Sequence, residues 1–216
     1  MLSKNGGMRI LIADDHAVFR HGLKDILARH FAGVSFGEVD TAQSALEAVW
    51  NQPWDIVVLD VSMPGRSGVE ILHDIHQARP KLPVLVLSMH PEEQYALRVL
   101  EAGASGYITK IKAAQDLVDA VEKVLAGGKY ISSKVADELV NQLRPGARKT
   151  PHEKLSNREF QIMRLTAQGK ATKDIALELS ISLQTVSTHR ARILKKLGLQ
   201  STAELIRYAV QNDLID

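Results

Sequence analysis

The chain has 216 residues, 45% hydrophobic and 24% charged, a composition typical of a globular protein with one large or two modest domains. It has no cysteine, which excludes a disulfide framework and a thiolate metal site, and no apolar run approaches the roughly 18 residues of a membrane span. We therefore expect a cytoplasmic protein without a membrane partner. The net charge of +2 is divided unevenly, because residues 1–127 carry 12 Lys and Arg against 16 Asp and Glu, whereas residues 128–216 carry 15 against 9. This pattern indicates an acidic module joined to one that tolerates a polyanion.

Strand and helix patterns alternate through residues 1–127, where apolar runs are followed by segments with helical spacing. The strands are expected at 8–13, 34–39, 56–59, 83–88 and 106–110, and the helices at 17–30, 42–51, 69–78, 92–101 and 113–126. Five βα units predict a parallel sheet with helices on both faces, and right-handed crossovers predict the flavodoxin-like strand order.

The chain changes character after residue 127. Residues 130–143 could form a helix, and residues 144–151 are polar, basic and interrupted by Pro and Gly, so we interpret 128–150 as a linker. No strand pattern follows, and residues 151–216 are expected to form an all-α domain with four helices at 156–168, 172–179, 182–197 and 201–212. Ser156 and Glu159 have the spacing of a capping box for the first of them.

Acidic residues end two of the predicted strands. Asp14 and Asp15 follow the first strand and Asp60 follows the third, and these strands should be neighbours in the sheet. We expect the turn at 64–68 to leave the Asp60 side chain facing solvent. Three carboxylates at one place suit Mg²⁺, which would offset the charge of a phosphoryl group while Asp60 attacks phosphorus.

An alternative is purely structural, with Asp14 and Asp15 capping the next helix and Asp60 as a turn residue. Two further strand ends argue against it. Ser88 supplies a hydroxyl donor and Lys110 a fixed cation, and a phosphoryl group requires both.

These residues resemble the receiver domain of two-component response regulators over residues 8 to about 127. The motifs that carry the resemblance are Asp14-Asp15, Asp60 with Met63-Pro64-Gly65, Ser88 and Lys110.

The resemblance implies that a partner histidine kinase phosphorylates Asp60. Lys110 would then contact the phosphoryl group, Ser88 would donate a hydrogen bond to it, and Tyr107 would follow as an aromatic switch. The implied Mg²⁺ ligands are Asp15, Asp60 and the Ser62 carbonyl, with Asp14 acting through water. By geometry, Ser62 and His90 flank the path of an attacking water and could tune hydrolysis of the acyl phosphate, although His90 is equally well read as a solvated loop residue.

The helices at 174–180 and 182–197 are separated by a short turn, which is the helix-turn-helix arrangement. A helical wheel places Val186, Ile193, Leu194 and Leu197 on one stripe. The opposite face carries Thr188, Ala191, Arg192 and Lys195, with Ser187 at its margin. Lys170, Lys173, Arg190, Lys195 and Lys196 are long cations that could meet phosphates.

Charged residues on a short helix are usually a solvated face, but here a longer motif resembles the LuxR-type domain of NarL/FixJ response regulators. The matching residues are Leu155-Ser156, Arg158-Glu159, Gly169, Ile175-Ala176, Leu179, Ile181-Ser182, Thr185-Val186, His189, Ile193 and Lys196-Leu197. The resemblance implies that the third helix binds DNA and that the fourth, 201–212, pairs with a second copy. The predicted DNA contacts are Lys173, Ser187, Thr188, Arg190, Ala191, Arg192 and Lys195.

Together these features predict a DNA-binding response regulator rather than an enzyme. Phosphorylation of Asp60 would switch homodimerisation, through the 92–126 face or the 17–30 face, and sequence-specific DNA binding, or would relieve masking of the DNA-binding helices. One alternative is a Mg²⁺-dependent aspartyl-phosphate phosphatase, against which Ser62 stands where a second acid would be needed. Another is a signalling adaptor whose helical domain binds protein.

Overall fold

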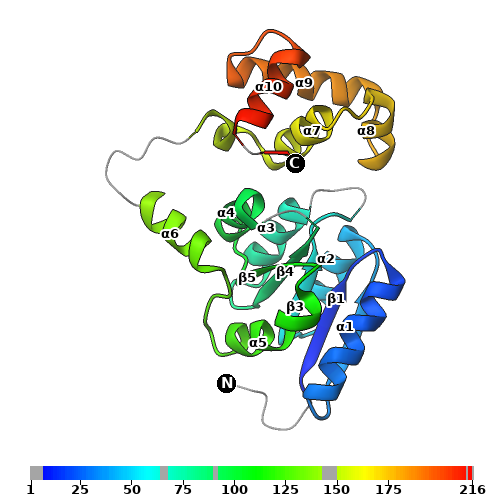
Figure 1. Ribbon diagram of the computed structural model, residues 1–216. Helices are drawn as coiled ribbons and strands as arrows, with labels where there is room; N and C mark the ends of the chain where they lie inside the picture. Colours follow the sequence, from blue (N-terminus) through cyan, green and yellow to red (C-terminus); the bar gives the residue numbers. More distant parts are fainter. Residues whose placement is uncertain (1–6, 64–67, 90–91, 143–149, 213, 216) are drawn as a thin grey trace. The chain divides into compact units, whose positions relative to one another are not determined.

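The computed structural model describes residues 7–63, 68–89, 92–142, 150–212 and 214–215 (Figure 1). The chain forms two compact units, Met1–Leu139 and Val140–Asp216, and each is described by itself below. Residues 143–149 of the predicted linker 128–150 lie outside the described residues, as do His90 and the turn residues Pro64 and Gly65. Within the part of the chain that is described, no helix is long and apolar enough to cross a membrane.

The first unit contains a five-stranded parallel sheet in the order β2-β1-β3-β4-β5, which confirms the flavodoxin-like prediction (Figure 1). Its strands are β1 (Arg9–Ala13), β2 (Ser35–Val39), β3 (Ile56–Asp60), β4 (Val84–Ser88) and β5 (Gly106–Thr109). Its helices are α1 (Ala17–His30), α2 (Ala42–Asn51), α3 (Gly68–Ala78), α4 (Glu92–Glu101) and α5 (Ala113–Leu125). Helices α1 and α5 pack together on one face, whereas α3 packs against both α2 and α4.

Burial explains the apolar sequence of the central strands. Every residue of β3 and of β4 is buried, because helices cover both faces of the sheet. Their register then fixes where the polar side chains at the strand ends lie. Ala13 is paired with Leu59, so Asp14 and Asp60 follow side by side, and Ser88 is paired with Thr109, so Lys110 emerges beside them.

The chain after α5 extends the sheet beyond β5. Tyr130 forms an isolated parallel bridge with Gly106, in which the Tyr107 N–H donates to the Tyr130 carbonyl (2.9 Å) and the Tyr130 N–H donates to the Ser105 carbonyl (3.0 Å). A side chain at Gly106 would place its Cβ 2.9 Å from the Tyr130 Cβ, so this close approach requires glycine. We call residues 129–132 the β5 extension.

Helix α6 (Ser133–Gln142) follows the β5 extension directly. The Ser132 N–H donates to Glu92 Oε1 at 2.8 Å, which ties the start of α6 to the start of α4, and Val135 is buried. The helix predicted at 130–143 is therefore present but begins three residues later, because Tyr130 pairs with Gly106 of β5 instead.

The second unit is helical. A 3-10 turn, η1 (Pro151–Lys154), which the sequence did not predict, precedes α7 (Asn157–Ala167), α8 (Thr172–Glu178), α9 (Leu183–Leu197) and α10 (Thr202–Gln211). The predicted capping box of Ser156 and Glu159 is present at the start of α7. Helix α9 packs against α7 and α8, and α10 packs against α7. The fully buried side chains at the centre of this unit include Phe160, Ile162, Met163, Ile175, Val186, Ile193, Leu205 and Ala209.

Candidate metal centre and nucleic-acid interface

Two carboxylates and one ammonium meet at the carboxyl edge of the sheet. Lys110 Nζ lies 2.7 Å from Asp60 Oδ2 and 2.6 Å from Asp14 Oδ2. The other oxygen of each carboxylate accepts a backbone hydrogen bond of 2.7 Å, from the Ser62 N–H to Asp60 Oδ1 and from the His16 N–H to Asp14 Oδ1. We call Asp14, Asp60 and Lys110 the acid triad.

The expectation that Asp60 faces solvent is wrong, because its exposed fraction is 0%. Asp60 lies at the end of β3, as predicted from the sequence. The ion pair between its carboxylate and the Lys110 ammonium was not predicted. The ammonium neutralises the carboxylate where it lies, and this ion pair makes its burial possible. The same ammonium lies 4.8 Å from the centre of the Phe19 ring, which adds a cation–π contact.

Burial and charge act in opposite directions within the acid triad. Burial is the largest influence on Asp60 and raises the pKa of its carboxyl, although the hydrogen bond and the charge of Lys110 lower that pKa in part. Burial alone would lower the pKa of the Lys110 ammonium, but its hydrogen bonds to Asp14 and Asp60 outweigh burial and raise that pKa. Two carboxylates share one cation, so the triad retains negative charge that a further cation would offset.

The third predicted acid, Asp15, is exposed and its Oδ1 lies 2.8 Å from His16 Nδ1. Ligand atoms of Asp14, Asp15, His16 and Asp60 all lie within 4.8 Å of one another. Three carboxylates in this space offer the oxygen donors that suit Mg²⁺, so the residues present fit that ion. Sequence reasoning missed His16, whose only signal is its position directly after the acidic pair.

The remaining predicted receiver residues, Ser88, Tyr107 and Ser62, lie in different environments. Ser88 ends β4 with an exposed fraction of 0%, and its carbonyl accepts from the Lys110 N–H at 2.8 Å. Tyr107 is buried in β5, whereas Ser62 is exposed. The structure thus gathers Asp14, Asp60, Ser88 and Lys110 in the interior and leaves Ser62 at the surface.

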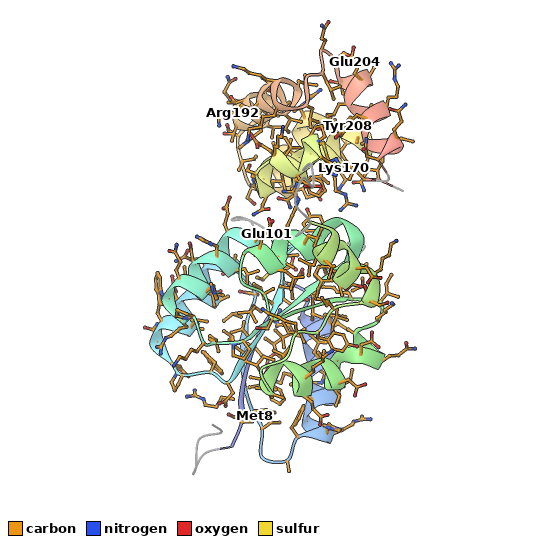
Figure 2. The ribbon with its side chains drawn as sticks, turned by 90° about the vertical axis from the view of Figure 1, so that its left-hand side faces the viewer. Met8, Glu101, Lys170, Arg192, Glu204 and Tyr208 are labelled. Atoms are coloured by element: carbon orange, nitrogen blue, oxygen red, sulfur yellow. The ribbon has the colours of Figure 1, made fainter. Side chains whose placement is uncertain are left out.

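In the second unit, the side chains of α9 divide into two faces. Val186 and Ile193 are buried and Leu194 and Leu197 are half-buried, as the helical wheel indicated. The residues of the opposite face, Ser187, Thr188, Ala191, Arg192 and Lys195, are all exposed. This face therefore presents two hydroxyls, the Ala191 methyl and two cations to solvent. Arg192, one of these cations, is labelled in Figure 2.

The two hydroxyls are partly engaged. Ser187 Oγ donates to the Leu183 carbonyl (3.0 Å) and Thr188 Oγ1 donates to the Gln184 carbonyl (2.9 Å), each one helical turn back. A hydroxyl oxygen that donates in this way still has lone pairs that accept hydrogen bonds.

The predicted phosphate-contacting cations fall into two groups. Arg190 donates to Thr172 Oγ1 (2.9 Å) and to Thr202 Oγ1 (2.5 Å), the first residues of α8 and α10. Lys196 forms an ion pair with Glu159, and Lys170 forms one with Glu178. Lys173 and Lys195, by contrast, form no ion pair within the described part of the chain, so cations that look alike in the sequence have different surroundings in the fold.

Comparisons with known proteins agree for both units. The family described as "Response regulator receiver domain" matches residues 10–122, and the family described as "Bacterial regulatory proteins, luxR family" matches residues 153–209. The oxygen regulatory protein NreC of Staphylococcus carnosus is 38% identical over 97% of this chain and 100% of its own length. The response regulator GacA of Pseudomonas aeruginosa is 32% identical over 97% of this chain and 98% of its own.

A solved structure of RcsB from Salmonella enterica serovar Typhimurium is also similar. In it, RcsB is bound to a promoter in the presence of the phosphomimetic BeF3⁻. The two chains are 26% identical with a TM-score of 0.58, over 94% of this chain and 98% of that one.

Proposed function

The chain belongs to the NarL/FixJ family of two-component response regulators, and we propose that phosphorylation of Asp60 controls how tightly this transcription regulator binds DNA. The observation that carries the proposal is the acid triad, in which the acceptor carboxylate already contacts a fixed cation at 2.7 Å. We assign residues 1–127 to the receiver domain, 128–150 to the linker and 151–216 to the DNA-binding domain.

In the proposed reaction, an oxygen of Asp60 attacks the phosphorus of a phosphohistidine on a partner kinase. The new O–P bond forms as the P–N bond breaks, and the imidazole nitrogen keeps the electron pair. The Lys110 ammonium would move from the Asp60 carboxylate to one oxygen of the phosphoryl group. The Ser88 hydroxyl would donate a hydrogen bond to another phosphoryl oxygen. Tyr107, which is hydrogen-bonded through its backbone to the β5 extension, is the predicted aromatic that responds.

We assign the Mg²⁺ site to Asp15, Asp60 and the Ser62 carbonyl, with Asp14 acting through water. When bound, the ion would offset the charge of the incoming phosphoryl group. The acid triad holds two carboxylates and one ammonium, and this excess of one negative charge supports the assignment because a second cation would balance it.

For the output, we propose that the exposed face of α9 enters the major groove of DNA. Ser187, Thr188 and Ala191 would face base edges, and Lys173, Arg192 and Lys195 would contact phosphates. We retain Arg190 in the interface as a residue that also fixes the starts of α8 and α10. The structure of RcsB bound to a promoter in the presence of a phosphomimetic supports the proposal that phosphorylation controls DNA binding in this chain.

We further propose that the phosphorylated protein is a homodimer. Helix α10 exposes Ile206 (37%) and Val210 (55%), which are one turn apart and would face a second copy. A near-complete switch requires a bias of roughly 5 kcal/mol, more than one hydroxyl contact supplies, so dimerisation coupled to phosphorylation would provide the rest.

The test measures DNA retention and oligomeric mass with and without acetyl phosphate and Mg²⁺. It compares the wild type with Asp60→Ala and with the matched variant Asp40→Ala, which removes an exposed carboxylate just after β2. We expect the phosphodonor to raise dimer mass and DNA affinity in the wild type and in Asp40→Ala but not in Asp60→Ala. DNA affinity that is high and indifferent to Asp60 would overturn the control step, and absence of DNA retention at low salt would favour a protein-binding adaptor.

A further inference from the structure

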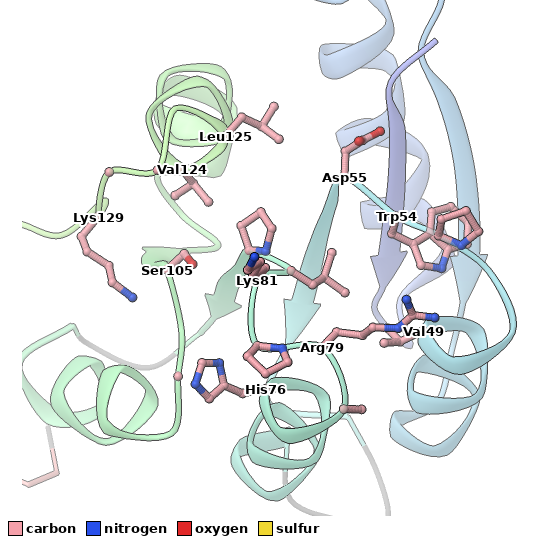
Figure 3. Close-up of a pocket in the computed structure, with 18 of the residues that line it drawn as sticks. Val49, Trp54, Asp55, His76, Arg79, Lys81, Ser105, Val124, Leu125 and Lys129 are labelled. Atoms are coloured by element: carbon pink, nitrogen blue, oxygen red, sulfur yellow. The ribbon is translucent and has the colours of Figure 1, made fainter. Parts of the chain in front are cut away.

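A hollow lies in the receiver unit, at the end of the sheet where β3, β4 and β5 begin (Figure 3). Its volume is about 750 Å³. It is bordered by the residues that lead into β3, β4 and β5 and by the carboxyl ends of α2, α3 and α5. Because all strands are parallel, the acid triad at their carboxyl ends and this hollow at their amino ends are separated by the length of the sheet.

The hollow combines cations with an apolar wall. Arg79, Lys81 and Lys129 line it together with His76, whereas the only carboxylate among its described lining residues is Asp55. Asp55 is already engaged, since its Oδ2 accepts from the Arg9 N–H at 2.8 Å. The apolar lining includes Val49, Leu82, Pro83, Val124 and Leu125.

The three cations differ in how they are held. Lys129 Nζ donates to the Ala104 carbonyl at 2.5 Å, and burial lowers the pKa of its ammonium. Within the described part of the chain, neither Arg79 nor Lys81 forms an ion pair, and both are exposed. In Figure 3 these two come from the turn between α3 and β4, while Lys129 comes from the segment after α5. Cations from two different parts of the chain therefore border one space.

We propose that this hollow, which we call the basic pocket, binds a small organic anion that carries two negative charges on an apolar body. The excess of cations over carboxylates excludes a metal ion as the occupant. The volume lies within the range of small-molecule sites, and the mixture of apolar wall and few charged groups is their usual composition. An anion between Lys129 and the Arg79–Lys81 turn would satisfy charges that the protein itself leaves unbalanced.

Occupancy of the basic pocket also bears on the β5 extension. Ser105 and Lys129 both line the pocket, and the Tyr130 N–H, one residue after Lys129, donates to the Ser105 carbonyl. A ligand that holds Lys129 against this edge restrains both partners of that hydrogen bond. The amide hydrogens of Tyr107 and Tyr130 should therefore exchange with solvent more slowly when the pocket is filled.

The test uses phthalate, an aromatic dicarboxylate, titrated into the full-length protein labelled with ¹⁵N. We expect saturable chemical-shift changes at the amides of Ser105, Leu125 and Lys129, together with slower exchange at Tyr107 and Tyr130. Lys81→Gln and Lys129→Gln should each weaken binding about tenfold. The matched variant Arg29→Gln, which removes an exposed cation of α1 outside the pocket, should bind as the wild type does.

Two controls keep the result specific. The neutral phthalamide should give no saturable shifts, and inorganic phosphate, which has charge without an apolar body, should bind more weakly than phthalate. The variants' own amide spectra show whether they remain folded. Shifts that do not saturate, or that persist undiminished in both Lys81→Gln and Lys129→Gln, would overturn the proposal, whatever the DNA assay of phosphorylation control shows.

Discussion

The acid triad and the exposed face of α9 place their charged groups in opposite environments. Asp14, Asp60 and Lys110 are buried, and the lysine pairs with both carboxylates, whereas Arg192 and Lys195 extend into solvent. A buried charge that loses its partner costs the fold directly, but an exposed one costs only the complex in which it takes part. Substitutions in the first region should therefore change stability, and substitutions in the second should change binding alone.

The largest effect is expected for Lys110→Met, which removes the only cation of the acid triad and leaves two buried carboxylates. Its free energy of unfolding at neutral pH and without Mg²⁺ should fall by roughly 3 kcal/mol, as measured by urea unfolding. The matched variant Lys112→Met removes an exposed ammonium two residues away and should cost less than about 0.5 kcal/mol. Equal costs for the two variants would show that Lys110 does not hold the carboxylates in place.

An intermediate effect is expected for Arg190→Leu, set against Arg192→Leu on the same helix. Arg190 donates to the first residues of α8 and α10, so its loss should destabilise the helical unit by about 2 kcal/mol. Arg192 is exposed, so its loss should leave stability unchanged while DNA affinity falls and the slope of log affinity against log salt decreases by about 1. If Arg192→Leu unfolds as readily as Arg190→Leu, the division between positioning and contacting cations is wrong.

The smallest effect, and of opposite sign, is expected for Asp60→Asn. Burial raises the pKa of Asp60 above its value in the unfolded chain, so the ionised carboxylate costs stability at any pH above its folded pKa. That cost disappears as pH falls through the folded pKa toward the unfolded one. Without Mg²⁺ the variant should be more stable than the wild type near neutral pH, with a difference that shrinks on acidification.

Thermal unfolding measured from neutral to acidic pH, with Asp40→Asn as the exposed control, gives the difference in stability between Asp60→Asn and the wild type. Mg²⁺ should stabilise the wild type more than Asp60→Asn, since ligand binding to the folded state adds to its stability. A variant that is less stable than the wild type at every pH would contradict the direction of the Asp60 pKa shift.

Much of the fold followed from local sequence patterns. The helices predicted at 17–30, 42–51 and 92–101 have these bounds in the structure, because apolar spacing and the residues that stop a helix act over a few positions. The strand order followed from the right-handed crossover, which leaves few alternatives. Family membership also followed from motifs, as the comparisons confirm.

What sequence could not predict depends on contacts between distant residues. The burial of Asp60 depends on where a lysine fifty positions later places its ammonium. The hydrogen bonds of Arg190 depend on the positions of two threonines that lie 18 and 12 residues away along the chain. The roles of the phosphorylation, metal and DNA-contacting residues stay predictions, and the experiments above address them.

The β5 extension has a further consequence for the solubility of the receiver unit. Strand β5 is an edge of the sheet, and an uncovered edge presents backbone donors and acceptors on which a strand from another molecule can pair. Tyr130 occupies the Ser105 carbonyl and the Tyr107 N–H at this edge. A receiver unit cut at residue 127 would lose these two hydrogen bonds and become prone to aggregate edge to edge. A receiver unit that continues through α6 would keep them and stay protected at this edge.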